Sequence, residues 1–480
     1  MTEHSSTDAA TRDANSTPAE APPNDRREIF GWLAYDWANS AFYTTVVGAL
    51  LGPYLTAIAQ SQVGENGVIF DLGWGIKTTA KSFFPHCVFF AVGLQALLLP
   101  VLGAVADYSR VKKRLMAVFC YTGVAANCLL FFVTGELYLL GGLLFIIATI
   151  CFGASIVFYN AYLVEITTED LRDKVSSRGF AFGYLGGGLL LALNLLLVVG
   201  AGSLGMSQGM AVRVSMLSAG VWWGGFAVIT FLRLRSRAPA RTLPPGRRLL
   251  TVGFVELGST FRELARLPRT LRFLLAYLFY NDGVQTVIHS ASLFIAQELF
   301  VSRGMETSQA FLLGIFLFVQ FVAFGGALLF ERVARVAGTK RAIMISLVVW
   351  AGIVVYAYAY FSSVTEAWVM AGFIAVVLGG SQALSRSLFS RMIPRGREAS
   401  FFGIYEISER GTSWIGPLVF GLVAAHTNSY RQAILSLIVF FIVGLVILYF
   451  TDTDRAVREA GNALPEEAAR EHAQEATNAG

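Results

Sequence analysis

The feature that most constrains this chain is a series of apolar runs, each long enough to form a helix across a bilayer. Such a helix needs about 20 mainly apolar residues, because the hydrocarbon core is roughly 30 Å thick. The composition agrees, since 55% of the 480 residues are hydrophobic and only 14% are charged. We therefore predict an all-α polytopic membrane protein with twelve transmembrane helices, at 29–59, 83–106, 115–134, 139–165, 177–201, 212–234, 272–300, 309–330, 342–361, 366–392, 400–426 and 430–451.

The basic residues lie unevenly between these apolar runs. One set of loops carries Arg110, Lys112, Lys113, Arg114, Arg172, Lys174, the stretch 233–272, Arg332, Arg335, Lys340, Arg341, Arg391, Arg395 and Arg397. The opposite set carries only Lys77, Lys81, Arg213, Arg303 and Arg431. Because positive residues concentrate in cytoplasmic loops, we predict cytoplasmic termini and a location in the cell membrane, inner or plasma. The clustering also argues against a nucleic-acid partner, although the formal net charge is +5.

The predicted helices divide into two halves of six. We expect a disordered cytoplasmic tail at 1–28, an N-terminal half at 29–234, a cytoplasmic linker at 235–271, a C-terminal half at 272–451 and a second cytoplasmic tail at 452–480. In the linker, Phe254, Leu257, Phe261 and Leu264 recur at helical spacing, which predicts an amphipathic helix. The halves look like pseudo-symmetric repeats, because "GAVADYSRVKKR" follows the second run and "GALLFERVARVAGTKR" the eighth. Paired repeats are typical of transporters, whose sites lie where the repeats meet.

At these residues the chain resembles the major facilitator superfamily. "GAVADYSRVKKR" is similar to the loop signature Gly-x-x-x-Asp-x-x-x-Arg-x-x-x-Arg/Lys, which Gly103, Asp107 and a basic cluster match, although Ser109-Arg110-Val111 replaces the usual Arg-x-Gly. The resemblance implies that Asp107 binds a helix end and gates cytoplasmic opening. Glu165 is expected at the same edge, as a gate or topology residue with Arg178 as its partner. The expected gate comprises Gly103, Asp107, Arg110, Lys113, Arg114, Glu165, Arg178 and Glu331.

A narrower resemblance covers nearly the whole membrane portion. The segments "WLAYDWANSAFYTTV", "FYNAYLVEI", "SSRGFAFGYLGGGLLL", "LFYNDGVQTV" and "GGSQALSRSLFSRMIPRGREASFFGIYEISERGTSWIGP" look like the vacuole-effluxer group. That group contains fungal autophagy-related amino-acid exporters and many bacterial members. The resemblance implies amino acids as the solute and export as the direction. The glycines of "GYLGGGLLLA" are expected to allow close helix packing rather than to bind phosphate.

Polar side chains inside spanning helices are rare and usually face the interior of a bundle or a water-filled path. In this chain, the first, fourth, fifth, seventh, tenth and eleventh predicted helices hold most of them. In major facilitators, the first, fourth, seventh and tenth helices line the central cavity, with the fifth and eleventh beside it. The candidate solute-binding or coupling residues are Asp36, Asn39, Asn160, Asn281, Asp282, Gln382, Arg386, Glu406, Glu409 and Arg410.

Several pairings among these residues can be expected. Asp36 has two candidate partners, Arg386 and Arg410. Glu406 and Arg410 are four residues apart and can pair on one helix face, either as a structural ion pair or in transport. Asp282 is the leading candidate for a protonatable carboxylate. Gly283 after it favours local unwinding of the helix, and the alternative is a capped break hydrogen-bonded within the helix.

Together these features predict a secondary active transporter that moves a small polar solute by alternating access. We expect an amino acid or similar solute, export, protons as the candidate coupling ion, a monomer, and neither cofactor nor metal. The alternatives are a polytopic membrane enzyme and a non-transporting receptor or scaffold. A lipid-modifying enzyme would call for clustered His with Asp or Cys, whereas His4, His86, His289, His426 and His472 are isolated. The buried charges argue against a scaffold.

Overall fold

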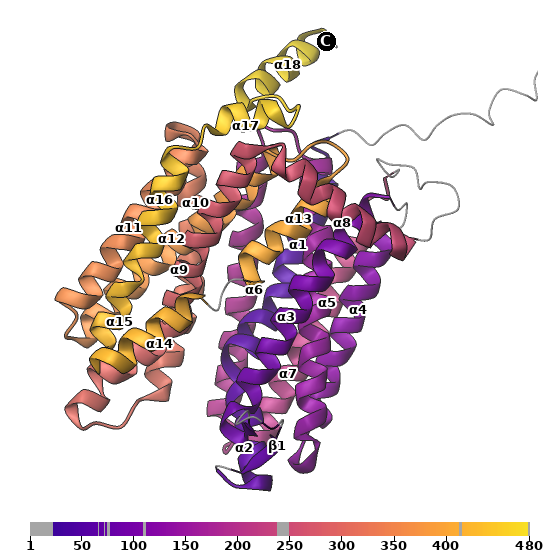
Figure 1. Cartoon of the computed structure of the whole chain (residues 1–480). Helices are drawn as coiled ribbons and strands as arrows, with labels where there is room; N and C mark the ends of the chain where they lie inside the picture. The colour runs from indigo at the N-terminus through magenta and orange to yellow at the C-terminus, as the bar shows by residue number, and fades with distance from the viewer. Residues whose placement is uncertain are drawn as a thin grey trace, which may run out of the picture.

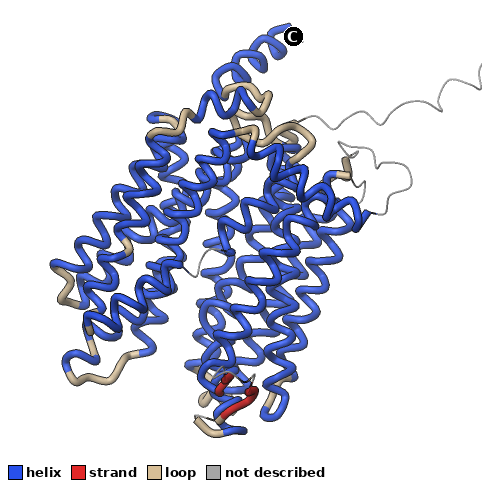
Figure 2. The backbone as a smooth tube through the Cα atoms, in the orientation of Figure 1, coloured by secondary structure: helices blue, strands red, loops and turns tan. Residues whose placement is uncertain are grey.

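A computed structural model describes residues 23–65, 67–71, 73, 77–108, 112–237, 249–411 and 415–478 of the chain. Nearly all of this is helical, and the helices form two bundles (Figure 1). The first bundle contains α1 (Arg26–Ala41), the π-helical η1 (Phe42–Leu50), α2 (Leu51–Val63), α3 (Ala80–Asp107), α4 (Lys112–Leu129), α5 (Tyr138–Ile166), α6 (Arg172–Val199) and α7 (Gln208–Arg233). A short antiparallel hairpin of β1 (Val68–Asp71) and β2 (Lys77–Thr79) precedes α3 (Figure 2).

The second bundle follows the linker helix α8 (Leu249–Ala265). It contains α9 (Pro268–Leu299), α10 (Gln309–Ala337), α11 (Thr339–Ala359), α12 (Val364–Arg391), α13 (Glu398–Glu406), the π-helical η5 (Ile407–Gly411), α14 (Ile415–Thr427), α15 (Tyr430–Ser436) and α16 (Ile438–Tyr449). Two short helices end the chain, α17 (Thr453–Glu459) and α18 (Pro465–Asn478). The predicted N-terminal tail lies mostly outside the described residues, which begin at residue 23.

Eleven helices of the described residues are long and apolar enough to cross a membrane, and they match eleven of the twelve predicted spans. The exception is the predicted span at 400–426, which is divided into α13, η5 and α14. Its middle carries polar residues where other spans are apolar, and Pro417 stands in the first turn of α14. Since proline has no N–H to bond to a preceding turn, it favours a new helix start at this point. The described residues of this span therefore comprise an α-helix, a π-helix and a second α-helix.

Residues Leu249–Ala265 of the linker form a helix. This helix, α8, packs against α3 of the first bundle. Leu264 is buried, while Phe261 is 48% exposed. Gly253 lies so close to Val101 and Val105 of α3 that a side chain there would overlap them. The linker is therefore held against the first bundle along one helix face.

Glycines of α6 allow the close packing expected of "GYLGGGLLLA". A Cβ at Gly183 would lie 2.7 Å from Ser40 Oγ, and one at Gly186 would lie 2.7 Å from the backbone oxygen of Trp37. Both contacts are with α1, so α6 and α1 approach at backbone distance. On its other side α6 packs against α10 and α12 of the second bundle. The α6 helix is thus a main contact between the two halves.

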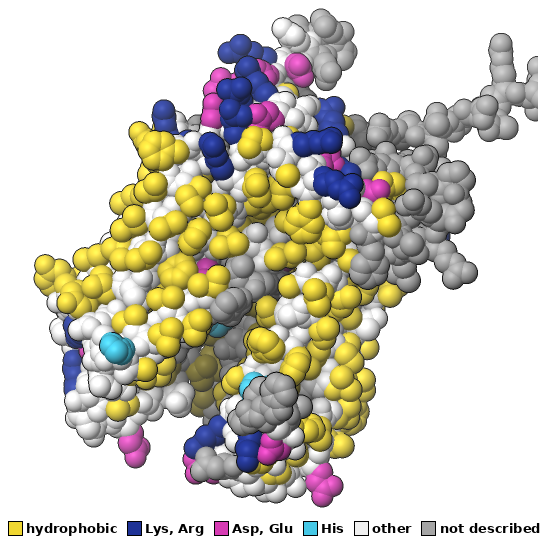
Figure 3. Space-filling view, viewed as in Figure 1, with side chains coloured by type: hydrophobic (Ala, Val, Ile, Leu, Met, Phe, Trp, Pro, Cys, Tyr) yellow, Lys and Arg dark blue, Asp and Glu magenta, His cyan; other side chains and the backbone are white. Residues whose placement is uncertain are grey.

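The two bundles meet at one end of the molecule and diverge at the other. Figures 1 and 2 show them converging beside α8, α13 and α17, and Figure 3 shows a hollow between them at the opposite end. Side-chain hydrogen bonds and ion pairs join the bundles near α8, for example between Arg172 and Ser390, Asp173 and Arg391, and Asp107 and Ser400. We call the end near α8 and α17 the closed end and the opposite end the open end.

The packing of α6 on α1 makes a prediction about stability. In Gly186→Ala the added methyl meets the Trp37 backbone, which has no rotamer to change. We expect the free energy of unfolding to fall by about 1–3 kcal/mol, as for other overpacked sites. Gly352→Ala on α11 is the matched control, because nothing lies within 4 Å of its added Cβ. The apparent Tm of both variants in detergent checks this, and an unchanged Tm for Gly186→Ala would contradict it.

Candidate functional site

Arg386 lies at the junction of the two halves and is only 4% exposed. It sits on α12, about 7.5 Å along the helix from the closed end at Arg391, given a rise of 1.5 Å per residue. Its Nε and Nη2 donate to the side chain and backbone oxygens of Ser176, at 2.9 and 3.0 Å. Its Nη1 donates to Asn160 Oδ1 at 3.3 Å and lies 3.5 Å from Asp36 Oδ2. All three partners belong to the first bundle.

Aromatic rings surround the same guanidinium. Its carbon lies 4.3 Å from the ring centre of Phe180, 4.9 Å from that of Trp32 and 5.6 Å from that of Tyr159. Trp32 and Tyr159 are themselves stacked at 4.3 Å. Cation–π attraction of this kind is strongest when the cation is desolvated. The cage therefore holds the Arg386 guanidinium in place beside its ion pair with Asp36.

Two buried carboxylates flank this guanidinium. Asp36 Oδ2 accepts from the Tyr159 hydroxyl at 2.6 Å. Glu406, which is 1% exposed, accepts from Asn160 Nδ2 at 3.1 Å. One connected cluster is thus formed by four of the predicted residues, Asp36, Asn160, Arg386 and Glu406. Of the two candidate partners of Asp36, the structure pairs it with Arg386. We call these four residues the central cluster.

The Arg410 side chain lies outside the described part of the structure, so its predicted pairing with Glu406 is not tested. The backbone around it is the π-helix η5, in which the four-residue spacing no longer places side chains directly above one another. Glu406 precedes η5 and turns toward Asn160 of the first bundle.

Further polar contacts lie beside the central cluster, and one of them involves Gln382, which is about one turn farther from the closed end on α12 than Arg386. Gln382 accepts from the Tyr184 hydroxyl at 2.7 Å, which again joins α12 to α6. Tyr280 and Ser385 share a hydrogen bond of 2.6 Å. Asn39 is 3% exposed, and its amide nitrogen has no partner among the described residues.

Asp282 faces the start of α14. Its Oδ2 accepts from the Gly416 backbone N–H at 2.8 Å, so it satisfies a free donor at a helix N-terminus. Its Oδ1 has no partner among the described residues, although the residue is 1% exposed. The neighbouring Asn281 donates to the backbone oxygen of Glu409 at 3.0 Å. Both predicted residues therefore contact the broken span.

The expected unwinding of the helix at Gly283 is wrong, because α9 continues from Pro268 to Leu299 without a break. Gly283 instead allows α16 to approach, since a Cβ there would lie 2.9 Å from Phe440 Cβ. The carboxylate of Asp282 contacts α14 of the facing span. Asp282 caps that span rather than a break in its own helix.

Asp107 binds a helix end, as the resemblance implied. Its carboxylate accepts from the backbone N–H groups of Ala399 and Ser400, at 3.0 and 2.9 Å, in the first turn of α13. Gly103 lies against the Ala399 backbone, where a Cβ would overlap the carbonyl oxygen. Since α3 and α13 belong to different halves, this contact holds the closed end together.

A model of the family described as "Vacuole effluxer Atg22 like" matches residues 24–461. The chain belongs to this family. It is 32% identical over 440 residues to the "Uncharacterized MFS-type transporter YxiO" of Bacillus subtilis, covering 90% of this chain and 97% of that protein. It is 24% identical to autophagy-related protein 22-1 of Aspergillus clavatus, covering 98% of this chain and 96% of that protein.

The fold also agrees with that of solved transporters. The crystal structure of the major facilitator superfamily transporter FucP in the outward conformation superposes with a TM-score of 0.63, at 11% identity, over 89% of this chain and 98% of that one. The predicted major facilitator fold is confirmed. This Atg22-like protein is an integral membrane transporter of small-molecule solutes and not an enzyme.

Glu165 of this Atg22-like transporter pairs with Lys112 and not with Arg178, so the expected partner was wrong. Lys112 begins α4 beside the end of α5, whereas Arg178 is almost two turns into α6 with an exposed side chain. Glu331 accepts from Arg335 of its own helix at 2.6 Å. Lys113 is half-buried, Arg114 is exposed and Arg110 lies outside the described residues.

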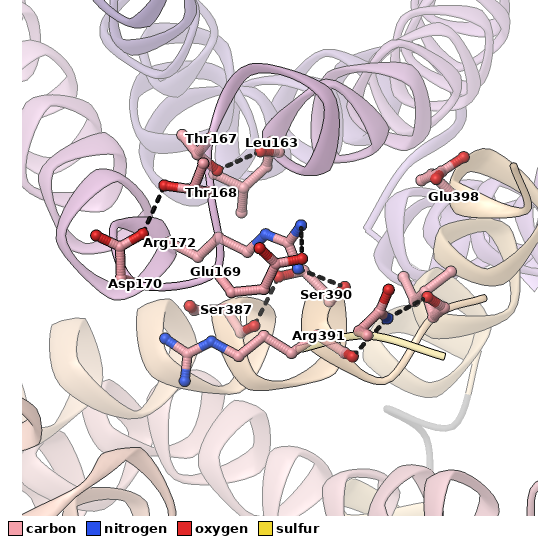
Figure 4. A network of polar contacts seen from close by, with 12 residues as sticks. Leu163, Thr167, Thr168, Glu169, Asp170, Arg172, Ser387, Ser390, Arg391 and Glu398 are labelled. Carbon is pink, nitrogen blue, oxygen red and sulfur yellow. Dashed lines mark hydrogen bonds and ion pairs between the residues drawn. The ribbon is translucent and has the colours of Figure 1, made fainter. Parts of the chain in front are cut away.

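A second contact between the halves was not expected from the sequence. Arg391 pairs with Asp173 at 2.9 Å and donates to Thr339 Oγ1 at 3.0 Å. Arg172 donates to the backbone oxygen of Ser390 at 3.3 Å, and Figure 4 shows these residues facing each other across the two halves. In the sequence these arginines were counted only as topology charges.

Arg397 joins the second half to the linker. It pairs with Glu256 at 2.8 Å and Glu263 at 2.7 Å, both on α8. Burial raises the pKa of Glu256, but hydrogen bonds from Ser259 and Tyr108 and the nearby Arg397 outweigh this and lower its pKa below the usual value. Glu256 therefore stays ionised at neutral pH and the contact persists. The linker helix is part of the closed end.

The Asp107 contact predicts how the closed end opens. Asp107→Ala removes an ionised acceptor worth about 1.5–3 kcal/mol, which shifts the population toward an opened closed end by roughly 10–100-fold. Ser390→Cys, in a background lacking Cys87, Cys120, Cys128 and Cys151, reports the opening, because Ser390 is fully buried. We expect maleimide labelling of this cysteine to accelerate in Asp107→Ala.

Glu331→Ala is the matched control for that experiment. Glu331 is a buried acid in the second half, and its ion pair is with Arg335 of the same helix. Its removal should change the labelling rate little. Equal labelling of the parent and of Asp107→Ala would show that this contact does not hold the halves together.

Proposed function

We propose that this transporter exports an amino acid or a similar small solute, and that Arg386 binds the carboxylate of that solute. The observation that carries the proposal is the position of the guanidinium. It belongs to α12 of the second half, but its polar contacts come from α1, α5 and α6 of the first. A solute that binds there acts on both halves at once, which is what alternating access requires of a transport site.

The chemistry of the central cluster fits a zwitterion. A guanidinium presents donors in a planar fork that matches a carboxylate. In the closed arrangement Asp36 occupies one side of this fork at 3.5 Å, a distance longer than a good charge-assisted hydrogen bond. A solute carboxylate can replace it, while Asp36 keeps the Tyr159 hydroxyl. Glu406, joined to Arg386 through Asn160, is an acceptor for the ammonium of the same solute.

The direction and topology are also proposals. We place both termini in the cytoplasm of a cell-membrane protein, because the basic residues gather near the closed end (Figure 3). The closed end is then the cytoplasmic gate and the described structure is outward-open. The family description "Vacuole effluxer" supports export. A monomer suffices, since both halves of the proposed site come from one chain.

Protons are the proposed coupling ion, and Asp282 is the proposed carrier. It is 1% exposed, and one of its carboxylate oxygens has no partner among the described residues. A buried charge within the membrane is costly unless it is paired or neutralised, so this oxygen is suited to accept a proton. Protonation would weaken the attraction between Asp282 and the N-terminus of α14. Binding of a proton would thereby weaken the contact between Asp282 and α14.

The role of Arg386 is tested by ligand binding. A thermal-shift screen of amino acids, peptides, sugars and organic acids on the detergent-solubilised protein first identifies a ligand. Arg386→Lys keeps the charge but loses the fork, and we expect the Kd to rise by roughly 10–100-fold, as for loss of a hydrogen bond between charged groups. Arg391→Gln is the control, because Arg391 is equally buried on the same helix but lies at the closed end. It should alter transport rate and leave the Kd within about threefold. Equal losses in both variants would remove Arg386 from the site.

The role of Asp282 is tested in proteoliposomes. Asp282→Asn cannot exchange a proton, so we expect it to lose solute movement driven by a pH gradient. Exchange of labelled for unlabelled solute should continue, because that reaction needs no net proton movement. Glu331→Gln is the control, as another buried acid of the second half, and should retain both activities. Transport by Asp282→Asn that is still driven by a pH gradient would contradict the proposal that Asp282 carries the proton.

A further inference from the structure

An apolar groove runs along the outer surface of the second half, between α11 and α16. It encloses about 640 Å³ and is lined by apolar side chains that include Met344, Val348, Leu445 and Phe450. Several of these are strongly exposed, with Val348 at 58% and Phe450 at 72%. Figure 3 shows hydrophobic side chains covering this side of the molecule. Because α11 and the segment Tyr430–Tyr449, which comprises α15 and α16, are both long and apolar enough to span a membrane, the groove faces lipid.

The groove is apolar along its length and cationic at one end. Its mouth lies at the closed end, where α11 begins and α16 ends. Arg341, exposed in the first turn of α11, is the charged residue of its lining. Among the described residues, Arg341 has neither an ion pair nor a side-chain hydrogen bond. The guanidinium of Arg341 thus lies at one end of the apolar groove.

The shape of the mouth is fixed by the adjacent lysine. Lys340 donates to the backbone oxygens of Tyr449 and Thr451, at 2.9 and 2.8 Å. These bonds satisfy carbonyl groups at the end of α16 and tie that end to the start of α11. Lys340 is therefore committed to the protein, and Arg341 is the cation that remains available. From Arg341 to Val349 the groove follows α11 for about 12 Å, at a rise of 1.5 Å per residue.

We propose that this groove binds one acyl chain of an anionic glycerophospholipid, with the lipid phosphate paired to Arg341. The occupant has to be an amphiphile, because the apolar trough lies within the hydrocarbon region and the cation lies at its edge. It has to be anionic, because the charged lining residue is a guanidinium. Arginine binds phosphate through two parallel hydrogen bonds, and basic pockets between spanning helices favour anionic headgroups. This site is on the lipid face, away from Arg386 and Asp282.

Native mass spectrometry of the full-length protein in detergent tests the proposal. The probes are phosphatidylglycerol and phosphatidylcholine with identical acyl chains. We expect the wild type to retain phosphatidylglycerol over phosphatidylcholine by roughly fivefold, the attraction expected of one basic residue near an anionic headgroup. Arg341→Gln should retain both lipids equally. Val348→Trp, which fills the trough with a bulky side chain at an exposed position, should lower the retention of both.

Arg332→Gln is the matched control. Arg332 is also exposed near the closed end, but it is on α10 and not in the groove. It should keep the wild-type preference, and the apparent Tm of each variant without added lipid verifies folding. Two results would overturn the proposal: a wild type without preference for phosphatidylglycerol, or an equal loss of preference in Arg332→Gln and Arg341→Gln.

Discussion

The burial of Arg386 is the constraint on which the polar interior of this protein depends. A charge inside a membrane bundle costs several kcal/mol unless it is paired or solvated. The Arg386 guanidinium contacts Ser176, Asn160 and Asp36 and is surrounded by aromatic rings, all from the first bundle. All of them lie on the half opposite to α12. Pairing the arginine and joining the halves are therefore the same interaction, and separating the halves at this level requires another anion to take the place of these partners.

The broken span makes the two halves unequal despite their repeated pattern. In two of its described helices, α13 and α14, a backbone N–H of the first turn donates to a buried carboxylate. A helix N-terminus carries partial positive charge, so both contacts are favourable. Asp107 reaches α13 from the other half, whereas Asp282 reaches α14 from the same half. The first contact must break when the closed end opens, and the second can persist through the whole cycle.

The spans could be predicted because apolar length is a local property of the sequence. The residues of the candidate site could be predicted only as a set. Asp36 and Arg386 are recognisable as charges in apolar helices, but the sequence does not show which residues they contact.

Three errors follow from this. Glu165 was assigned to Arg178, when the packing of α4 on α5 brings Lys112 closer. The unwinding was assigned to Gly283, although a glycine can equally serve the approach of a neighbouring helix, as it does here with α16. Arg391 and Asp173 were overlooked because charges near helix ends are usually topology signals.

The central cluster and Asp282 are connected through one short stretch of backbone. Glu406 at the end of α13 accepts from Asn160, Glu409 in η5 accepts from Asn281 through its backbone oxygen, and Gly416 in α14 donates to Asp282. The connecting segment η5 is π-helical, a conformation that is rare and often found where helices change shape in function. A solute that draws Glu406 away from Asn160 therefore pulls on the segment whose other end is held by Asn281 and Asp282. In the proposed mechanism, solute and proton are coupled because both act on residues that contact this one segment.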